Sequence, residues 1–479
     1  MFKKLIILVV LVFISIPVFA QSVDTSWIRR YNGPGNDHDA AFAIAVDFSG
    51  NVYVTGESYG NGCSYNYLTV KYYPNGDTAW VRSYDGGDGD EASAIAVDDS
   101  GYVYVTGQSW GVDSYYDYVT IKYYPNGDTV WIRRYNGPGN VQDRARGIAI
   151  DDSGNAYVTG TSGTVKYDTN GNQLWVDSLS GSAIAVDASG NVYVTGSAGT
   201  IKYNTYGNQL WIQKWGGIDI VVDIFGNAYV TGNNLGLSVY ATIKYYSNGD
   251  TAWIRTYNGL GNPVDINEAR SISVDDSGNV YVTGHSWSGA SRYDYGTIKY
   301  YPSGDTAWVR RYNGPKNFSD WASAIGVDNS GNVYVTGYSA QLKTSPYNYD
   351  YASVKYDKDG NKCGVARYNG PGDDEDIPTD MVVGRYGYAY VTGWSYGIEA
   401  LGDYATMKYV HFFLVGDANN NKVLDVSDVI YIIAYLFKGG SVPIPDILAG
   451  DTNCDGDVTV TDVIYLINYL FKGGPPPIC

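Results

Sequence analysis

Histidine and basic residues are scarce in this chain, and their scarcity excludes two classes of site. The three histidines, His38, His285 and His411, are scattered, so they cannot form a metal cluster of their own. No nucleophile motif, phosphate-binding loop or histidine-based zinc motif is visible. The 32 Lys and Arg are outnumbered by 50 Asp and Glu, and the net charge of −18 repels phosphate backbones. Nucleic acid is therefore not an expected partner.

Long hydrophobic runs are absent except at the N-terminus. Lys3 and Lys4 precede an apolar run, Leu5 to Val18, that is too short to span a bilayer, and a plausible cleavage site ends at Ala20. Residues 1–20 are therefore predicted to be a secretory signal peptide, the alternative being a membrane anchor. No cysteine follows Ala20, so a lipoprotein anchor is not indicated. We expect a secreted or extracellular protein that does not span a membrane and that a partner can attach to a cell surface.

Cysteine is limited to four residues, which excludes a dense disulfide framework. Cys63 and Cys363 belong to different repeats and need not pair. Cys454 and Cys479 lie near the C-terminus and can pair in an oxidising compartment. Whether they do stays open at this point.

One pentapeptide, Val/Ala-Tyr-Val-Thr-Gly, is abundant and occurs eight times. Its copies end at Gly56, Gly107, Gly160, Gly196, Gly232, Gly284, Gly337 and Gly393. The spacings are 51, 53, 36, 36, 52, 53 and 56 residues. Self-similarity on this scale is typical of stacked or radially arranged supersecondary units.

Each repeat contains four short segments of strand composition in a constant order. Examples are Ala43 to Asp47, Asn51 to Gly56, Thr120 to Tyr123 and Thr306 to Tyr312. Asp-x-Ser-Gly-Asn joins the first two segments and Pro-Asn-Gly-Asp joins the last two, and Asn-Gly supplies the positive φ that a tight hairpin needs. Four antiparallel strands per unit, repeated eight times, predict an all-β fold, a β-propeller.

The count of strands predicts how the ring closes. The last unit stops after Tyr404 to Val410 without a fourth strand, whereas the first segment, Asp24 to Tyr31, is a fourth strand with no unit before it. We therefore expect this N-terminal strand to complete the last of eight four-stranded blades, which removes exposed sheet edges. The alternatives are an open β-solenoid or a seven-bladed ring with one unit displaced.

The repeat, with Asp-x-Ser-Gly-Asn-Val-Tyr-Val-Thr-Gly-x-Ser followed by Lys-Tyr-x-x-x-Gly, resembles the bacterial SBBP-type β-propeller repeat family. The resemblance covers roughly residues 24–410 of a domain predicted at residues 21–410. It implies a propeller, but the family has no single known activity.

After Leu414 the pattern changes to an acidic loop of twelve residues followed by an amphipathic helix, and this unit is present twice. Oxygen ligands at loop positions 1, 3, 5, 7, 9 and 12 are those that Ca²⁺ requires. In the first loop they are Asp417, Asn419, Asn421, the Val423 carbonyl, Asp425 and Asp428; in the second they are Asp451, Asn453, Asp455, the Asp457 carbonyl, Thr459 and Asp462. We expect two bound calcium ions, the alternative being acidic turns that only cap the helices.

Aspartate at position 12, the single helix after each loop and the duplication make the tail similar to type I dockerin domains. The resemblance covers Gly416 to Gly474 of a predicted domain, residues 416–479, that a linker at 411–415 joins to the propeller. Position 6 is Lys422 in the first loop but Gly456 in the second. Lysine at positive φ is strained, so the first loop is expected to bind calcium more weakly.

The dockerin resemblance also implies a partner, a cohesin-like module of a scaffold protein. It implies that loop positions 10 and 11 face this partner, and here they are Val426 and Ser427 in one copy and Val460 and Thr461 in the other. Both copies have a hydrophobic and hydroxyl pair, so either side of the pseudo-twofold can dock.

The two ends of the predicted propeller differ in their connections. Turns between strands one and two, and three and four, are uniformly tight, whereas all length variation lies in the loops at the other end. Binding usually lies in variable loops on a rigid scaffold, so we assign function to this loop-rich face. Aromatic residues follow the pentapeptide there and suit sugar stacking or a protein partner, the alternative being packing on the blade; they are Tyr59, Trp110, Trp287, Tyr338, Trp394 and Tyr396.

A repeated Asp-x-Ala before the first strand of a blade is the second feature of this face. It places Asp39, Asp90, Asp143, Asp320 and Asp376, with Asn267 in the sixth unit, near the mouth of the central channel. Such a ring can hold a cation or sugar hydroxyls; the alternative is a side chain that caps the backbone amides of its own loop.

The sequence favours a secreted, calcium-binding propeller that attaches through its dockerin and binds a glycan or an extracellular protein on its loop-rich face. The alternatives are a polysaccharide-degrading hydrolase or lyase with its site on that face, and a passive structural or adhesive surface protein. No catalytic residue can be named, because aspartate is so common that no pair stands out.

Overall fold

The computed structural model describes residues 24–60, 64–111, 115–233, 239–259, 267–289, 292–341, 348–385, 387–398, 401–410, 418–419, 424–441, 443, 450, 452 and 458–472. The predicted signal peptide and linker, and Cys63, Cys454 and Cys479, lie outside these ranges. Within them, no helix is both long enough and apolar enough to cross a membrane.

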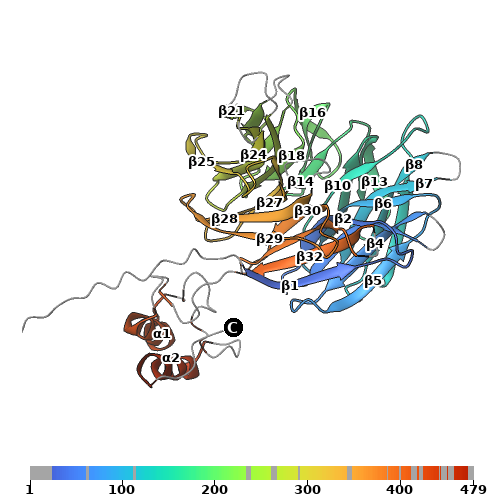
Figure 1. Cartoon of the computed structure of the whole chain (residues 1–479). Helices are drawn as coiled ribbons and strands as arrows, with labels where there is room; N and C mark the ends of the chain where they lie inside the picture. Colours follow the sequence, from blue (N-terminus) through green and yellow to red (C-terminus); the bar gives the residue numbers. More distant parts are fainter. Residues whose placement is uncertain are drawn as a thin grey trace, which may run out of the picture.

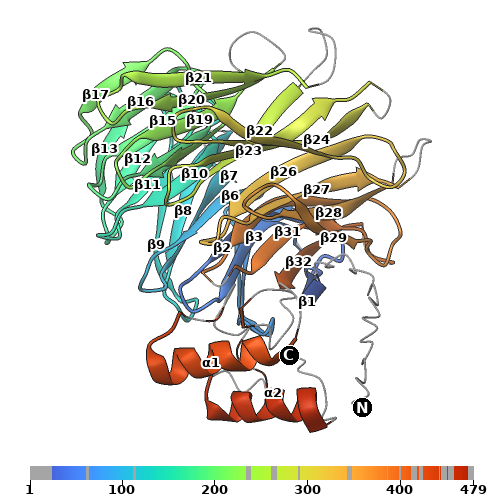
Figure 2. The same cartoon turned by 90° about the vertical axis from the view of Figure 1, so that its left-hand side faces the viewer.

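The described strands form eight antiparallel sheets of four strands each, which are the blades of a propeller (Figures 1 and 2). The first four blades are β2 to β5 (Asp39–Val46, Val52–Tyr59, Tyr65–Tyr72, Thr78–Tyr84), β6 to β9 (Asp90–Val97, Val103–Trp110, Tyr116–Tyr123, Thr129–Tyr135), β10 to β13 (Ala145–Ile150, Ala156–Gly160, Gly163–Tyr167, Gln173–Asp177) and β14 to β17 (Ala183–Val186, Val192–Gly196, Gly199–Tyr203, Gln209–Gln213). The next three are β18 to β21 (Asp219–Val222, Ala228–Gly232, Tyr240–Tyr245, Thr251–Tyr257), β22 to β25 (Asn267–Val274, Val280–Trp287, Tyr293–Tyr300, Thr306–Tyr312) and β26 to β29 (Asp320–Val327, Val333–Ala340, Tyr349–Tyr356, Lys362–Tyr368).

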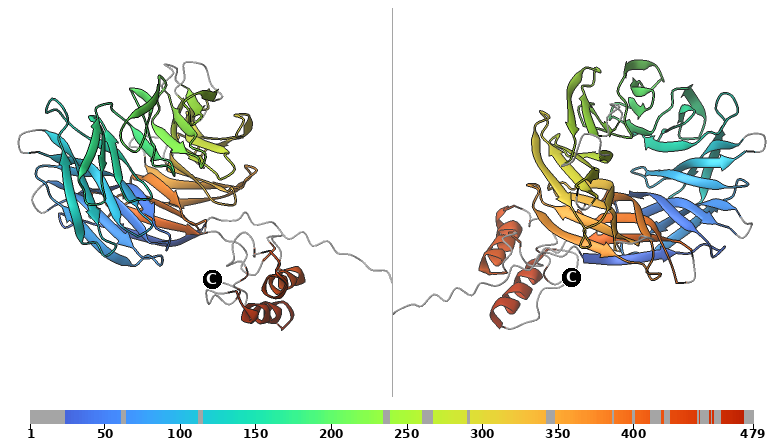
Figure 3. Two further views of the ribbon diagram at one scale, coloured as in Figure 1. Left: turned by 180° about the vertical axis from the view of Figure 1, so that it is seen from behind. Right: turned by 45° about the horizontal axis from the view of Figure 1, so that its top comes forward.

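The eighth blade confirms the predicted closure of the ring. It consists of β30 (Asp376–Val383), β31 (Ala389–Ser395), β32 (Asp403–Val410) and the N-terminal strand β1 (Asp24–Tyr31). β1 pairs antiparallel with β32, with Ile28 opposite Met407, and the two strands lie side by side in Figure 1. The blades follow one another in chain order around the ring, so the first and the last meet (Figure 3). The open solenoid and the seven-bladed ring are therefore wrong.

The pentapeptide is the buried second strand of every blade. Its tyrosines are at most 5% exposed and pack between neighbouring blades, which explains the abundance of this residue; they are Tyr53, Tyr104, Tyr157, Tyr193, Tyr229, Tyr281, Tyr334 and Tyr390. Its glycine is needed because the first strand bulges toward it: a Cβ on Gly56 would lie 2.0 Å from the Ala40 carbonyl oxygen. Both features come from packing rather than from ligand binding.

The C-terminal tail contains two helices, α1 (Val426–Lys438) and α2 (Val460–Lys472), which lie side by side (Figures 1 and 2). A small core between them includes Val429, Ile432, Val463 and Leu466. Asp425 and Asp428 form a capping box at the start of α1, and Gly439, at φ 64°, ends the helix in the left-handed conformation that glycine favours.

Candidate functional site

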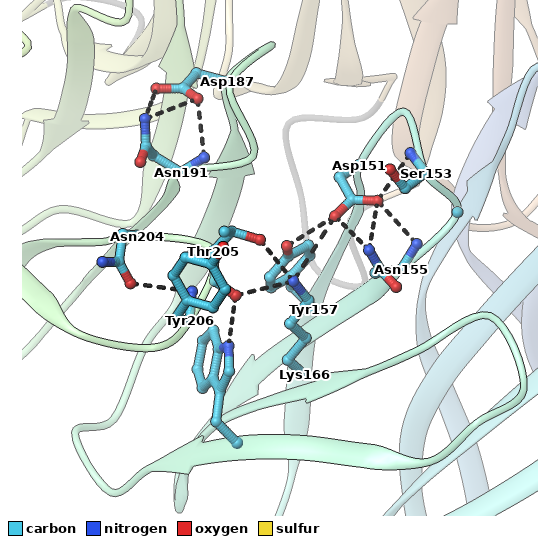
Figure 4. Close-up of polar contacts among 12 residues, drawn as sticks. Asp151, Ser153, Asn155, Tyr157, Lys166, Asp187, Asn191, Asn204, Thr205 and Tyr206 are labelled. Carbon is cyan, nitrogen blue, oxygen red and sulfur yellow. Dashed lines mark hydrogen bonds and ion pairs between the residues drawn. The ribbon is translucent and has the colours of Figure 1, made fainter.

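The tight-turn face of the propeller, where strands one and two and strands three and four are joined, is saturated with internal hydrogen bonds. Figure 4 shows the arrangement in the third and fourth blades. The Asp151 carboxylate accepts from the Ser153 and Asn155 amides at 3.0 and 2.9 Å, and from the Tyr157 hydroxyl at 2.8 Å. Lys166 lies 4.7 Å from the Tyr157 ring centroid and donates to the Thr205 carbonyl of the next blade at 3.0 Å. One lysine occupies this position in each blade.

A tryptophan of the fourth strand ties each blade to the next on the same face. In β1, Trp27 Nε1 donates to the Pro74 carbonyl at 3.0 Å and Arg29 Nε donates to the Gly76 carbonyl at 2.6 Å. Gly76 has φ +86°, and a Cβ there would lie 2.8 Å from the Trp27 ring. Equivalent indole bonds are made by Trp80, Trp131, Trp175, Trp211, Trp253 and Trp308. We call these contacts the tryptophan bolts.

The seventh blade lacks this bolt, and the reason is the closure of the ring. Gly364 of β29 occupies the tryptophan position, because it pairs with Lys355 as Trp308 pairs with Lys299. In the eighth blade the third and fourth strands, β32 and β1, come from opposite ends of the propeller sequence and are not joined by a turn. The seventh blade therefore has no carbonyl of such a turn to which an indole could donate. At this position of the fourth strand, tryptophan is therefore present only where the next blade has a turn to accept its indole.

Cavities open on the tight-turn face, and two of them lie between neighbouring blades. One, of about 510 Å³, lies between the second and third blades and is lined by Asp98, Asp99, Asp151 and Asp152, among others. The other, of about 260 Å³, lies between the sixth and seventh blades and is lined by Asp275 and other residues. No buried polar side-chain atom that lacks a hydrogen-bond partner lines either cavity within the described residues. Their polar groups serve the fold.

The loop-rich face contains the predicted aspartates, and their contacts match the capping alternative. Asp39 is 0% exposed; it accepts from the Gly33 amide at 2.5 Å and from the Tyr59 amide at 3.1 Å. The glycine-amide contact repeats at Asp90, Asp143, Asp320 and Asp376, and Asn267 bonds Ser286 and Trp287. Burial raises the pKa of Asp320 and Asp376 to about 6. These side chains lie inside the blades and cap loop amides, as the alternative expects; a ring of carboxylates that holds a cation or sugar hydroxyls stays a prediction.

An arginine–aspartate pair, which sequence reasoning missed, braces the loop-rich end of four blades. Its members are Arg30–Asp403, Arg134–Asp117, Arg311–Asp294 and Arg367–Asp350, with N–O distances of 2.6, 3.0, 3.2 and 3.9 Å. The first blade has Ser83 and Asn66 at these positions, and the fifth has Thr256 and Val239. Both partners are present together or absent together, which a search for repeats does not reveal.

The predicted aromatic residues lie half-buried on the loop-rich face, at or just beyond the end of the second strand. Trp110, Trp287 and Tyr338 each meet a third-strand tyrosine edge-on: Tyr116 at 5.1 Å, Tyr293 at 5.3 Å and Tyr349 at 5.2 Å between ring centroids. Tyr59 meets Tyr65 at 5.2 Å, and Trp394 meets Tyr396 at 5.5 Å. Each ring keeps partial exposure, so packing and ligand contact are both compatible with its position.

The described part of the tail contains the last ligand of each predicted calcium loop. Asp428 and Asp462 are 0% exposed. Asp428 accepts from the Asn419 and Asp425 amides at 3.3 and 3.0 Å, and Asp462 accepts from the Thr452 and Thr459 amides at 2.8 and 2.7 Å. Asp417, Asn421, Val423, Asp451, Asn453, Asp455 and Asp457 lie outside the described residues.

The described residues of the calcium loops fit a hard cation. Each buried carboxylate draws the start and the end of its loop together, and the side chains of Asn419, Asp425 and Thr459 add further oxygen atoms. The predicted partner-facing residues Val426 and Val460 are 47% and 48% exposed, and Ser427 and Thr461 are also exposed.

Comparisons with known families agree with this geometry. The model of the SBBP beta-propeller repeat matches residues 27–62, 85–115, 130–164, 256–289 and 308–340, and the model of the dockerin type I domain matches residues 415–471. No curated protein matches the chain.

Solved structures with a similar fold are distant in sequence. Regucalcin from Agrobacterium tumefaciens, a calcium-binding protein, is 14% identical over 56% of this chain and 92% of its own, with a TM-score of 0.34. The WD40 domain of SCAP from fission yeast is 11% identical over 80% of this chain and 98% of its own, with a TM-score of 0.42. Likeness at this level carries no functional argument. The chain is a β-propeller with SBBP repeats and a C-terminal type I dockerin domain.

Proposed function

We propose that this protein is a secreted binding module: its dockerin attaches it, in a calcium-dependent way, to a cohesin-like partner, and its propeller presents the loop-rich face to a glycan or an extracellular protein. The duplicated loop and helix with one buried aspartate each, Asp428 and Asp462, is the observation that carries the attachment. Dockerins act by binding cohesins in extracellular complexes, which supports the proposed partner and compartment.

The tail supports attachment through an apolar stripe that each helix leaves exposed. Val426, Ile430 and Phe437 of α1 are 47%, 61% and 65% exposed, and Val460, Ile464 and Phe471 of α2 are 48%, 53% and 64% exposed. The spacing of i, i+4 and i+11 puts each set on one side of its helix. The two helices thus offer equivalent apolar surfaces, as expected for docking in either of two orientations.

Calcium binding would supply part of the folding free energy of this tail, since the hydrophobic core that its described residues form is small. Two oxygen-rich loops support the proposal of two ions. Loop two should dominate, because Gly456 suits position 6 better than Lys422.

The test is calorimetric titration of the full chain with calcium, followed by capture on an immobilised type I cohesin. Replacing Asp451 and Asp462 by Ala should abolish calcium-induced helicity and capture, whereas replacing Asp417 and Asp428 should cost less. Asp250→Ala, which removes one exposed carboxylate of the propeller, is the matched control. Capture that persists in EDTA would contradict the proposal, and equal losses in the two pairs would refute only the ranking.

The glycan or protein contact of the propeller is tested separately. Replacing Trp110, Trp287 and Trp394 by Ala should remove binding to the loop-rich face while the far-ultraviolet spectrum stays unchanged. Interface tryptophans commonly contribute about 2 kcal/mol or more each, so the combined loss should be large. A ligand that binds the triple variant unchanged would show that the face is wrongly assigned.

A further inference from the structure

One layer of side chains at the channel end of the loop-rich face is not repeated from blade to blade. It contains the residue after each pentapeptide and the central residue of each Asp-x-Ala, which pair across the first two strands, as Gln108 pairs with Glu91 and Tyr338 with Trp321. We call these the rim positions. Because the surrounding residues repeat and the rim residues do not, the layer is free to carry a function that differs around the ring.

The rim positions of successive blades touch one another. His285 of the sixth blade and Trp321 of the seventh have ring centroids 4.5 Å apart. His285 follows the pentapeptide of its blade, and Trp321 is the central residue of Asp-x-Ala in the next blade. The equivalent pair between the seventh and eighth blades is Tyr338 and Ile377, and between the first and second blades it is Glu57 and Glu91. The repeat therefore places two glutamates side by side between the first and second blades.

Glutamate is rare in this chain, which makes the pair conspicuous. Only five of the 50 acidic residues are glutamates: Glu57, Glu91, Glu268, Glu375 and Glu399. Both members of the pair are only partly exposed. Burial and the neighbouring Glu91 and Asp39 carboxylates raise the pKa of Glu57 to about 7, and burial also raises the pKa of Glu91. The structure records no hydrogen bond to the Glu57 carboxylate from the residues that it describes.

A buried amide beside the pair has an unused acceptor. Gln108 is 7% exposed; its Nε2 donates to Glu91 Oε2 at 3.0 Å, and its Oε1 has no hydrogen-bond partner within the described part of the chain. A buried polar atom without a partner costs free energy, so Gln108 Oε1 is an acceptor that a ligand donor can satisfy. Gln108 is independent evidence, because it is neither acidic nor repeated.

The surroundings of the glutamates indicate which donor this is. Tyr59 and Tyr65 stand next to Glu57, and Arg144 lies 5.6 Å from the Tyr116 ring centroid near Glu91. On the other side of the first blade the rim residues are aromatic: Trp394, Tyr338 and Trp321. The Trp321 indole Nε1 is also buried and has no hydrogen-bond partner among the described residues. Aromatic faces next to carboxylate and amide acceptors suit a chain of sugar rings, whose hydroxyls donate while their apolar faces stack.

We propose that Glu57, Glu91 and Gln108 form a binding site for a neutral oligosaccharide at the channel end of the loop-rich face, between the first and second blades. Sugar hydroxyls donate to Gln108 Oε1 and to the glutamate carboxylates, and the adjoining aromatic residues take the next rings. The inference rests on the proposed function and names the ligand class of that face. An acidic saccharide is disfavoured by the two carboxylates and by the net charge of −18.

The test is calorimetric titration of the full, calcium-loaded chain with cellohexaose, xylohexaose and mannohexaose. At least one should bind, and Glu57→Gln, Glu91→Gln and Gln108→Leu should each weaken it about tenfold or more, since hydrogen bonds to charged groups are the strong ones. Glutamine already occupies the Glu57 position in the second blade, so Glu57→Gln is expected to fold. Glu268→Gln is the matched control: it removes the same charge at the Glu91 position of the sixth blade, where Arg270 lies 2.8 Å away, and should change affinity less than twofold.

The outcomes separate the site from the proposed function. If a neutral hexasaccharide binds and the three variants bind it equally well, the site is wrong and the proposed function stands. If none binds, or if tetragalacturonate binds in preference, the neutral-glycan inference falls. A calcium titration in which Glu57→Gln removes one binding event would overturn it in favour of a cation site. Release of reducing ends that Glu57→Gln and Glu91→Gln abolish would support the site and make it catalytic.

Discussion

The two faces of the propeller are built from the same strands but treat their polar groups differently. On the tight-turn face the first aspartate of the turn, the lysine and the indole make contacts that recur in several blades, as Asp151, Lys166 and Trp131 show. On the loop-rich face Asn66, Gln108, Trp321 and Asn348 each have a buried polar atom without a hydrogen-bond partner among the described residues. The tight-turn face therefore serves stability, and the loop-rich face retains groups that stability alone does not explain.

Cavity size would have led to the opposite assignment. The cavity of about 510 Å³ lies on the tight-turn face, yet the buried polar groups of its lining have partners there: Asp98 accepts from the Ser100 amide, and Lys122 donates to the Thr169 carbonyl. Unused hydrogen-bonding capacity discriminates better than volume here, because a ligand must offer the protein something that it lacks.

The largest expected effect comes from opening the ring. Deleting residues 21–35 removes β1, leaves the outer edge of β32 unpaired and removes the bolt between Trp27 and Pro74. We expect loss of the cooperative thermal transition, or a large fall in its midpoint. Trp27→Ala is a milder change at the same strand and should lower the free energy of unfolding by about 3–5 kcal/mol, as large-to-small substitutions of buried tryptophan do. Trp131→Ala, the same bolt between the second and third blades, should cost as much; a much smaller loss at Trp27 would show that closure contributes little.

The next effect concerns the arginine–aspartate pairs. Arg134→Ser leaves the Asp117 carboxylate, 5% exposed, without its cation and should cost about 2–4 kcal/mol in chemical denaturation. Adding Asp117→Asn reproduces the pair of the first blade, Ser83 with Asn66, and should recover most of this loss. A double variant that is less stable than the single one would refute the idea that the two residues depend on each other.

Glu57 should destabilise the propeller at neutral pH, as a residue kept for binding can. Its pKa is about 7 in the folded protein against an ordinary 4.5, so the unfolded chain loses its proton first as the pH rises. Stability is therefore lost between about pH 4.5 and 7. Glu57→Gln should be more stable than the parent by about 1–3 kcal/mol at pH 8 and equal to it at pH 4. Urea denaturation at both pH values checks this. If the difference in stability between variant and parent is the same at pH 4 and pH 8, the pKa of Glu57 is not raised by folding.

His285, at the same rim position, should act in the opposite direction. Burial and Arg270 lower the pKa of His285 to about 4. As the pH falls below about 6.5, His285 therefore becomes protonated in the unfolded chain while it stays neutral in the folded protein. Stability is then lost between about pH 6.5 and 4. His285→Gln, which copies the second blade, should reduce the loss between pH 7 and 4.5 by about 1–3 kcal/mol. Parallel pH profiles of variant and parent would contradict the assignment of this acid sensitivity to His285.

The sequence predicted the fold well because packing repeats. Eight pentapeptides and the unmatched Asp24–Tyr31 segment determine the number of blades and their closure, and both follow from counting strands. The rim layer that we propose as the binding site was missed for the same reason. Asp39 and its equivalents attracted attention because they repeat, and they turned out to cap loops. Glu57 and Glu91 come from different blades and match no repeat, so only their spatial neighbourhood relates them.

Two tryptophans of the second blade offer the finest comparison of the faces, because they share a sheet and differ in role. Trp131 is 6% exposed and bolts the blade to its neighbour, whereas Trp110 is half-buried and meets Tyr116 edge-on at 5.1 Å. Trp110→Ala should cost about 1 kcal/mol of stability, the value of such an aromatic contact, and should weaken oligosaccharide binding. Trp131→Ala should lower stability several times more while the molecules that remain folded keep their affinity. Thermal melting gives the stability of each variant, and calorimetry gives its affinity for the oligosaccharide. If stability and affinity fall together in both variants, the loop-rich face is not the binding face and the tight-turn face is not the stabilising face, contrary to what their hydrogen bonds indicate.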